Sequence, residues 1–244
     1  MIKLATLFIV LAIISFTGMS QQNKSEVMII GTIHQAHSAN PNYTYDSLFA
    51  YIDRFDPDII GIEIRKEDID SSLTYLSQNY PFEMIECLRR YPEKKVYGFD
   101  WLGHDLEGKG IPSNYWVETS SVKKLQKELS RDTLMYWKLS LLKAIQTEQH
   151  RIVLNASLPE FNDGKYDLIT FIYYKQMETI FQDTPYAALP DFFRQRDQKI
   201  AGNIIDLIQD NKGKKMIFLL GADHRDYTLK KIKEELGQEI ILNP

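Results

Sequence analysis

Short apolar runs alternate with helical patterns over the first hundred residues of the chain. Apolar residues spaced three and four apart predict a helix over 45–55 and a largely helical segment over 66–91 that is broken near Pro81. Runs rich in Val, Ile, Tyr and Phe, which are typical of buried strands, lie at 27–31, 58–63 and 95–100. Strands separated by helices of this length predict βαβ units and a mostly parallel sheet.

The alternation stops in the middle of the chain, where residues 113–211 have helical patterns and a single weak strand pattern at 152–154. The helical patterns there cover about 120–149, 165–181 and 190–210. The last elements are a strand, a helix and a strand, at 216–220, 227–236 and 239–242. We therefore predict an α/β fold with a mostly parallel central sheet flanked by helices and a large helical insertion before the last strands. We expect this insertion to lie over the carboxyl edge of the sheet, as a lid or side wall.

The amino terminus has the pattern of a secretory signal. A short basic region precedes an apolar stretch from Leu4 to Phe16, and small residues follow it up to Ser20. The stretch is shorter than the ~20 residues that a membrane span needs. We predict a signal peptide over 1–20, a periplasmic or secreted location, and no stable membrane span after cleavage. The alternative is an uncleaved anchor in the inner membrane.

Composition and charge fit one ordinary domain over 21–244. The chain has 244 residues, 44% of them hydrophobic, and a net charge of −4, which does not favour nucleic acid as a partner. No linker rich in Gly, Ser or Pro borders the insertion, so it is not expected to be a separate domain. The single cysteine, Cys87, lies in a helical segment and is expected to be a buried apolar residue.

Each of the four main strands ends close to a side chain that can carry chemistry. These side chains are His34, Glu63, Asp100 and His224, and both histidines stand in a Gly-x-x-His pattern. Because parallel strands share a carboxyl edge, we expect the four to meet there. Such a set suits a divalent metal or general acid–base chemistry. The alternatives are a structural ion pair of Glu63 with an arginine such as Arg65, and a capping role for Asp100.

Arg196 is a fifth candidate, because it shares a helix face with Phe192 and Ile200. A guanidinium that faces the core needs an anion, which could be Glu63, a substrate carboxylate or a developing oxyanion. The alternative is that Arg196 extends to solvent. Aromatic residues of the insertion are candidates for the wall of a substrate cleft or for the core: Tyr115, Trp116, Tyr136, Trp137, Tyr173 and Tyr174.

Four motifs together resemble the TraB/PrgY/GumN and Tiki superfamily, to which erythromycin esterases and ChaN haem-binding lipoproteins are related. They are Gly31-Thr-Ile-His34, Gly61-Ile-Glu63, Arg196-Asp197 and Gly221-Ala-Asp-His224. The resemblance covers about 26–100 and 190–242 and implies an α/β core with both histidine motifs and the glutamate in one cleft. It also implies that His34, Glu63, Arg196 and His224 are the site residues. Asp197 departs from the family, which often has asparagine there.

The expected activity is that of an exported hydrolase that cleaves an amide or ester bond in a peptide or a small-molecule ester. His34, Glu63, Asp100 and His224 are the candidate ligands of a divalent metal such as Mn, Co or Zn, whose bound water would be the nucleophile. Without a metal, Glu63 or a histidine would activate water directly. The alternatives are a haem- or iron-binding envelope protein, which the ChaN resemblance implies, and a non-catalytic interaction module.

Overall fold

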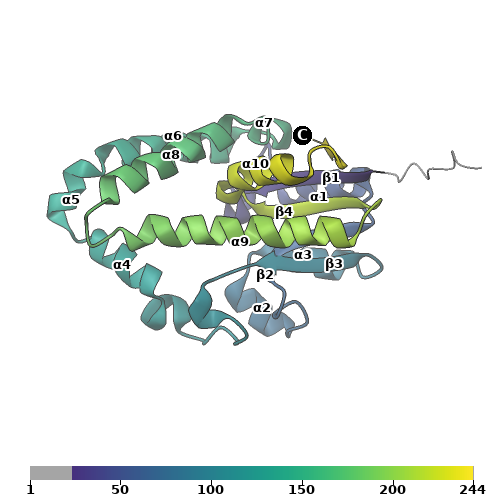
Figure 1. Ribbon diagram of the computed structural model, residues 1–244, viewed down its shortest axis with the longest axis horizontal. Coiled ribbons are helices and arrows are strands. Elements are labelled where there is room, and N and C mark those ends of the chain that lie inside the picture. The colour runs from purple at the N-terminus through teal and green to yellow at the C-terminus, as the bar shows by residue number, and fades with distance from the viewer. Residues whose placement is uncertain (1–23, 244) are drawn as a thin grey trace, which may run out of the picture.

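Five parallel strands form one sheet in the order β3-β2-β4-β1-β5 (Figure 1). The structure is a computed structural model that describes residues 24–243. The predicted signal peptide, residues 1–20, lies outside the described residues. The strands are β1 (Ser25–Thr32), β2 (Ile59–Arg65), β3 (Lys95–Asp100), β4 (Lys215–Gly221) and β5 (Ile240–Asn243).

Helices cover both faces of the sheet and build the insertion. The prediction of an α/β fold with a helical insertion before the last strands is confirmed. The helices are α1 (Tyr45–Phe55), α2 (Leu73–Asn79), α3 (Phe82–Arg90), α4 (Ser121–Leu129), α5 (Thr133–Lys138), α6 (Ser140–Asn155), α7 (Leu158–Phe161), α8 (Lys165–Phe181), α9 (Ala188–Asp210) and α10 (Arg225–Leu236).

The sheet is buried on both faces because successive side chains of a strand point to opposite sides. Along β1, Met28 and Ile30 join the core beneath α1 and α3. Val27 and Ile29 join the core beneath α9 and α10. This double burial explains why the strands read as continuous apolar runs rather than as alternating ones.

The register of β1 and β4 positions the two histidine motifs. These strands are parallel neighbours, with Gly31 opposite Leu220 and Thr32 opposite Gly221. After each of the two strands the backbone leaves the sheet in a short 3₁₀ turn, over His34–Ser38 after β1 and Ala222–His224 after β4. The two motifs therefore emerge side by side at one edge of the sheet.

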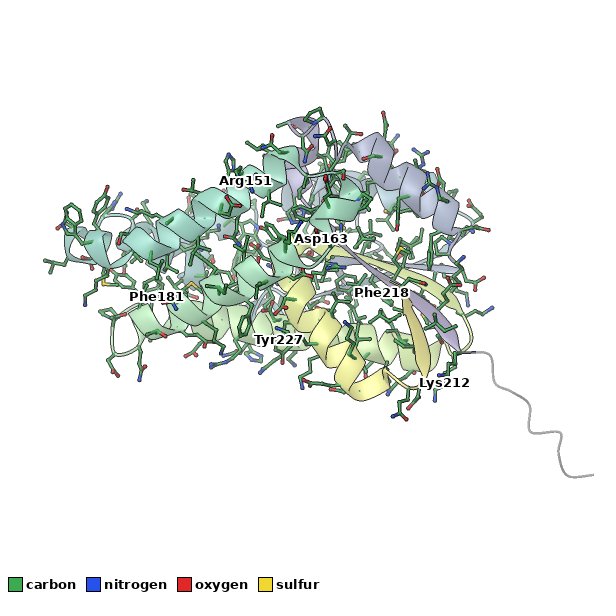
Figure 2. All side chains as sticks on the ribbon, turned by 90° about the horizontal axis from the view of Figure 1, so that it is seen from above. Arg151, Asp163, Phe181, Lys212, Phe218 and Tyr227 are labelled. Atoms are coloured by element: carbon green, nitrogen blue, oxygen red, sulfur yellow. The ribbon has the colours of Figure 1, made fainter. Side chains whose placement is uncertain are left out.

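The insertion extends beyond the carboxyl edge of the sheet (Figure 1). Figure 2 shows Phe181, the last residue of α8, far from Phe218 of β4. A separate apolar cluster holds the distant part together and includes Met135, Met177 and Phe181. The prediction of a weak strand at 152–154 is wrong, because these residues continue α6, and Ile152 and Val153 pack against the main core. Among residues 24–243, no helix combines the length and apolar character needed to cross a bilayer.

Candidate functional site

Four of the predicted site residues lie around one cavity of about 290 Å³ at the carboxyl edge of the sheet: His34, Glu63, Arg196 and His224. Asp100 lies behind them, bound to Arg196. The insertion supplies part of the cavity wall through Val153, Tyr166 and Tyr174.

Glu63 is the centre of the cluster. One of its oxygens, Oε1, accepts a hydrogen bond from Nη2 of Arg196 at 2.6 Å and lies 3.7 Å from Nε2 of His224. The other oxygen accepts a hydrogen bond from the backbone N–H of Gly221. Burial would raise the pKa of this carboxyl, but the positive charge of Arg196 and of the two histidines outweighs burial and lowers it. The ion-pair partner of Glu63 is Arg196. Arg65, the alternative partner, binds Asp68 instead.

Arg196 joins Glu63 to Asp100. Its Nε and Nη2 donate to the two oxygens of Asp100 at 3.0 and 3.1 Å. Asp100 also accepts a hydrogen bond from the backbone N–H of Trp101 at 2.7 Å. Burial raises the pKa of Asp100 to about 6, with the charge of Glu63 adding to the effect and that of Arg196 opposing it. The guanidinium therefore faces two buried carboxylates, as its position on the apolar helix face required.

His224 is held by Asp197, the residue next to Arg196 on α9. Its Nδ1 lies 2.5 Å from Oδ1 of Asp197, which leaves Nε2 facing Glu63. Burial and Arg196 lower the pKa of His224, but the hydrogen bond to Asp197 and the charge of Glu63 outweigh them and raise it. Asp197 thus places a carboxylate on this imidazole.

His34 has the same arrangement with a carboxylate from a different helix. Its Nδ1 lies 2.8 Å from Oε1 of Glu83, a fully buried residue in the first turn of α3. Burial lowers the pKa of His34, but the hydrogen bond to Glu83 and the charge of Glu63 raise it above its ordinary value. His34 also has a φ of 50°, in the left-handed region that non-glycine residues seldom adopt and that is common at functional sites.

The free nitrogen of His34 faces Gly221 and Glu63. A Cβ at Gly221 would lie 2.8 Å from Nε2 of His34 and 3.2 Å from Oε2 of Glu63. The close approach of these two side chains therefore requires glycine at this position. Sequence reasoning did not select Glu83, although it lies four residues before Cys87, which was expected to be buried on the same helix face.

The remaining histidines have other surroundings. His37 is buried, and its two ring nitrogens bond to the backbone of Ile33 and Tyr43, so it stabilises the turn after β1. His104 and His150 are exposed. Of the aromatic candidates in the insertion, Tyr174 lines the cavity, and α5 leaves Tyr136 and Trp137 in solvent.

The metal site expected from the sequence requires free oxygens on Glu63 and Asp100. Arg196 binds both carboxylates, and the Gly221 N–H binds the second oxygen of Glu63. Within residues 24–243, no group of three or more His, Cys, Asp or Glu side chains is placed to hold a metal ion. In this arrangement the four expected ligands do not form a metal site. Metal binding stays a prediction.

No protein-family model, no curated protein and no solved structure matches this chain. The functional argument therefore depends on the site itself. Its chemical content is two imidazoles, each with one nitrogen bound to a carboxylate, together with a guanidinium at the wall of the same cavity. Such an arrangement can accept, hold and return protons and can stabilise negative charge.

Proposed function

We propose that this protein is a hydrolase that cleaves an ester or amide bond. The observation that carries the proposal is the pair of imidazoles, His34 and His224, which share one cavity and each have Nδ1 bound to a carboxylate. A carboxylate on Nδ1 fixes the tautomer and makes Nε2 a better base. The motifs that resemble the TraB/PrgY/GumN and Tiki superfamily contain these residues, and membership of that superfamily is part of the proposal, as is export from the cytoplasm.

His34 is the general base in this proposal. Its side chain is 39% exposed, against 7% for His224, so water and substrate reach it more readily. Nε2 of His34 takes a proton from water as the water oxygen bonds to the carbonyl carbon. The same nitrogen then gives the proton to the leaving oxygen or nitrogen as the carbon–heteroatom bond breaks. Glu83 holds the ring in place through both transfers.

His224 and Arg196 stabilise the negative charge that develops on the carbonyl oxygen. The raised pKa of His224 makes its cationic form more favourable than that of an ordinary histidine. Arg196 lies at the wall of the same cavity and carries a permanent charge. Glu63 contacts Arg196 and lies beside His224, so it positions the cationic groups. No step in this sequence passes through a metal.

Hydrolysis of a panel of simple esters and peptides by the wild type and by His34→Ala tests the proposal. Loss of a general base typically costs ~10²–10⁴-fold in rate, so we expect kcat to fall by about that factor. His150→Ala is the matched control, because His150 is exposed on α6 and does not line the cavity. The proposal is wrong if the wild type hydrolyses no member of the panel, or if His34→Ala hydrolyses it as fast as His150→Ala does.

A further inference from the structure

A second cavity of about 290 Å³ adjoins the first. The two cavities share Phe193 and Arg196 in their walls, so they are neighbours. Aromatic rings from three parts of the chain line the second cavity: Trp101, Tyr115, Trp116, Phe192 and Phe193. Together they surround a space that borders the first cavity at Phe193 and Arg196.

Three rings of this cavity, those of Trp101, Tyr115 and Phe192, are held by neighbouring side chains of the protein. Trp101 stacks on Phe192 with ring centroids 6.0 Å apart and an interplanar angle of 26°. The indole N–H of Trp101 donates to Glu107 at 2.6 Å, and the hydroxyl of Tyr115 donates to Asp105 at 2.8 Å. Rings already held by neighbours lose little freedom when a ligand arrives, so their contacts contribute more of their energy to binding.

We propose that this cavity binds a neutral aromatic group of the substrate, adjacent to the bond that is cleaved. Flat aromatic walls favour another ring through stacked and edge-to-face contacts. Glu63 and Asp100 already neutralise Arg196, and the other two charges on the wall, Lys123 and Asp105, are of opposite sign, so the wall favours neither a cation nor an anion. Because Phe193 and Arg196 line both cavities, a ring bound here lies beside the space where the carbonyl meets His34. This proposal rests on the proposed hydrolase function and specifies its substrate class.

Binding of two uncharged probes tests the cavity without using catalysis. N-acetyl-L-phenylalaninamide and N-acetyl-L-alaninamide differ by one phenyl ring, and an NMR chemical-shift titration gives the Kd of each. We expect the phenyl probe to bind at least about tenfold more tightly to the wild type, and to His34→Ala as well, because His34 does not line this cavity.

Two variants change the cavity in different ways, and a third leaves it intact. Trp116→Ala removes a wall, and Val122→Phe fills the space from α4, so each should abolish the preference for the phenyl probe. Trp137→Ala, which replaces an exposed tryptophan on α5, should retain it. The proposal is overturned if the wild type binds the two probes equally or binds neither. It is also overturned if Trp116→Ala and Val122→Phe both keep the preference.

Turnover of the matching methyl esters separates the two proposals. If both hold, the phenylalanine ester is hydrolysed with a kcat/KM at least about tenfold above that of the alanine ester. Hydrolysis of both esters at equal rates, without a binding preference, contradicts the aromatic cavity and leaves the hydrolase function standing. A binding preference without hydrolysis of any ester or peptide contradicts the hydrolase function and leaves the aromatic cavity standing.

Discussion

Arg196 is the cation that joins Glu63 to Asp100, and Arg196→Met leaves these two carboxylates without it. Both are nearly buried, with 5% and 6% of their surface exposed. Removing one partner of a buried ion pair typically destabilises a protein by about 3–5 kcal/mol, because a charge stays behind without compensation. We expect a loss of that order in the free energy of unfolding at about pH 7.5.

The size of the loss depends on pH in a way that the structure specifies. Asp100 already has a pKa of about 6 beside Arg196, and loss of the guanidinium raises the pKa further. In the folded variant Asp100 then keeps its proton. Asp100 of the unfolded chain releases this proton, and Asp100 of the folded wild type releases it above pH 6. Its stability is therefore highest in acid and falls as pH rises. Over the roughly 1.5 pH units above 6, one proton corresponds to about 2 kcal/mol.

Urea unfolding of the wild type and Arg196→Met at about pH 5.5 and about pH 7.5 measures this difference. We expect the loss in free energy of unfolding to be larger by about 2 kcal/mol at the higher pH. The matched control is Arg194→Met, two residues away on the same helix, where an exposed arginine pairs with the exposed Asp191. A loss no larger than that of the control, or a loss that is equal at the two pH values, would refute the reasoning.

Three further predictions follow from the contacts of the site. Glu83→Gln removes the charge that raises the pKa of His34, so the rising limb of the pH profile of kcat/KM should move to lower pH. The value of kcat/KM should also fall by about 10–100-fold. An unchanged rising limb would contradict this role of Glu83. Gly221→Ala brings a Cβ to 2.8 Å from Nε2 of His34, so the imidazole must shift and kcat should fall. Gly202→Ala, with no atom within 4 Å of its added Cβ, should leave kcat unchanged. Equal rates for the two variants would exclude a positioning role for Gly221. Incubation with EDTA should leave the rate of ester hydrolysis unchanged, because Arg196 already binds the carboxylates that a metal would need; a loss that added Zn²⁺ or Mn²⁺ restores would show that the metal prediction is right.

The strands and their ends could be predicted because local physics determines them. Apolar runs that stop at a glycine identify buried strands, and a parallel sheet brings their carboxyl ends to one edge. The strand ends alone therefore predict that His34, Glu63, Asp100 and His224 lie together. The need of a core-facing guanidinium for an anion likewise connected Arg196 to Glu63.

The carboxylates that hold the histidines could not be predicted in the same way. Glu83 reaches His34 because α3 packs against β2 and places its first turn under the carboxyl edge. Asp197 reaches His224 because α9 lies along the sheet beside α10. Such packing depends on the order of the strands and the angles of the helices, which periodicity along one segment does not contain. The structure of residues 152–154 could not be predicted for the same reason. An apolar triplet is compatible with a strand or with a buried helix, and packing of α6 against α8 favours the helix.

The central claim is that one carboxylate, Glu63, acts electrostatically on two imidazoles, those of His34 and His224, which lie 190 residues apart in the chain. Its charge raises the pKa of both His34 and His224, and both pKa values lie above the ordinary 6.5. An NMR titration of the histidine ring protons in the wild type and in Glu63→Gln, with assignments from His34→Ala and His224→Ala, measures this directly. The account predicts that both midpoints lie above 6.5 in the wild type and that both fall in Glu63→Gln. Midpoints at or below 6.5, or a substitution that moves one histidine and leaves the other unchanged, would contradict it.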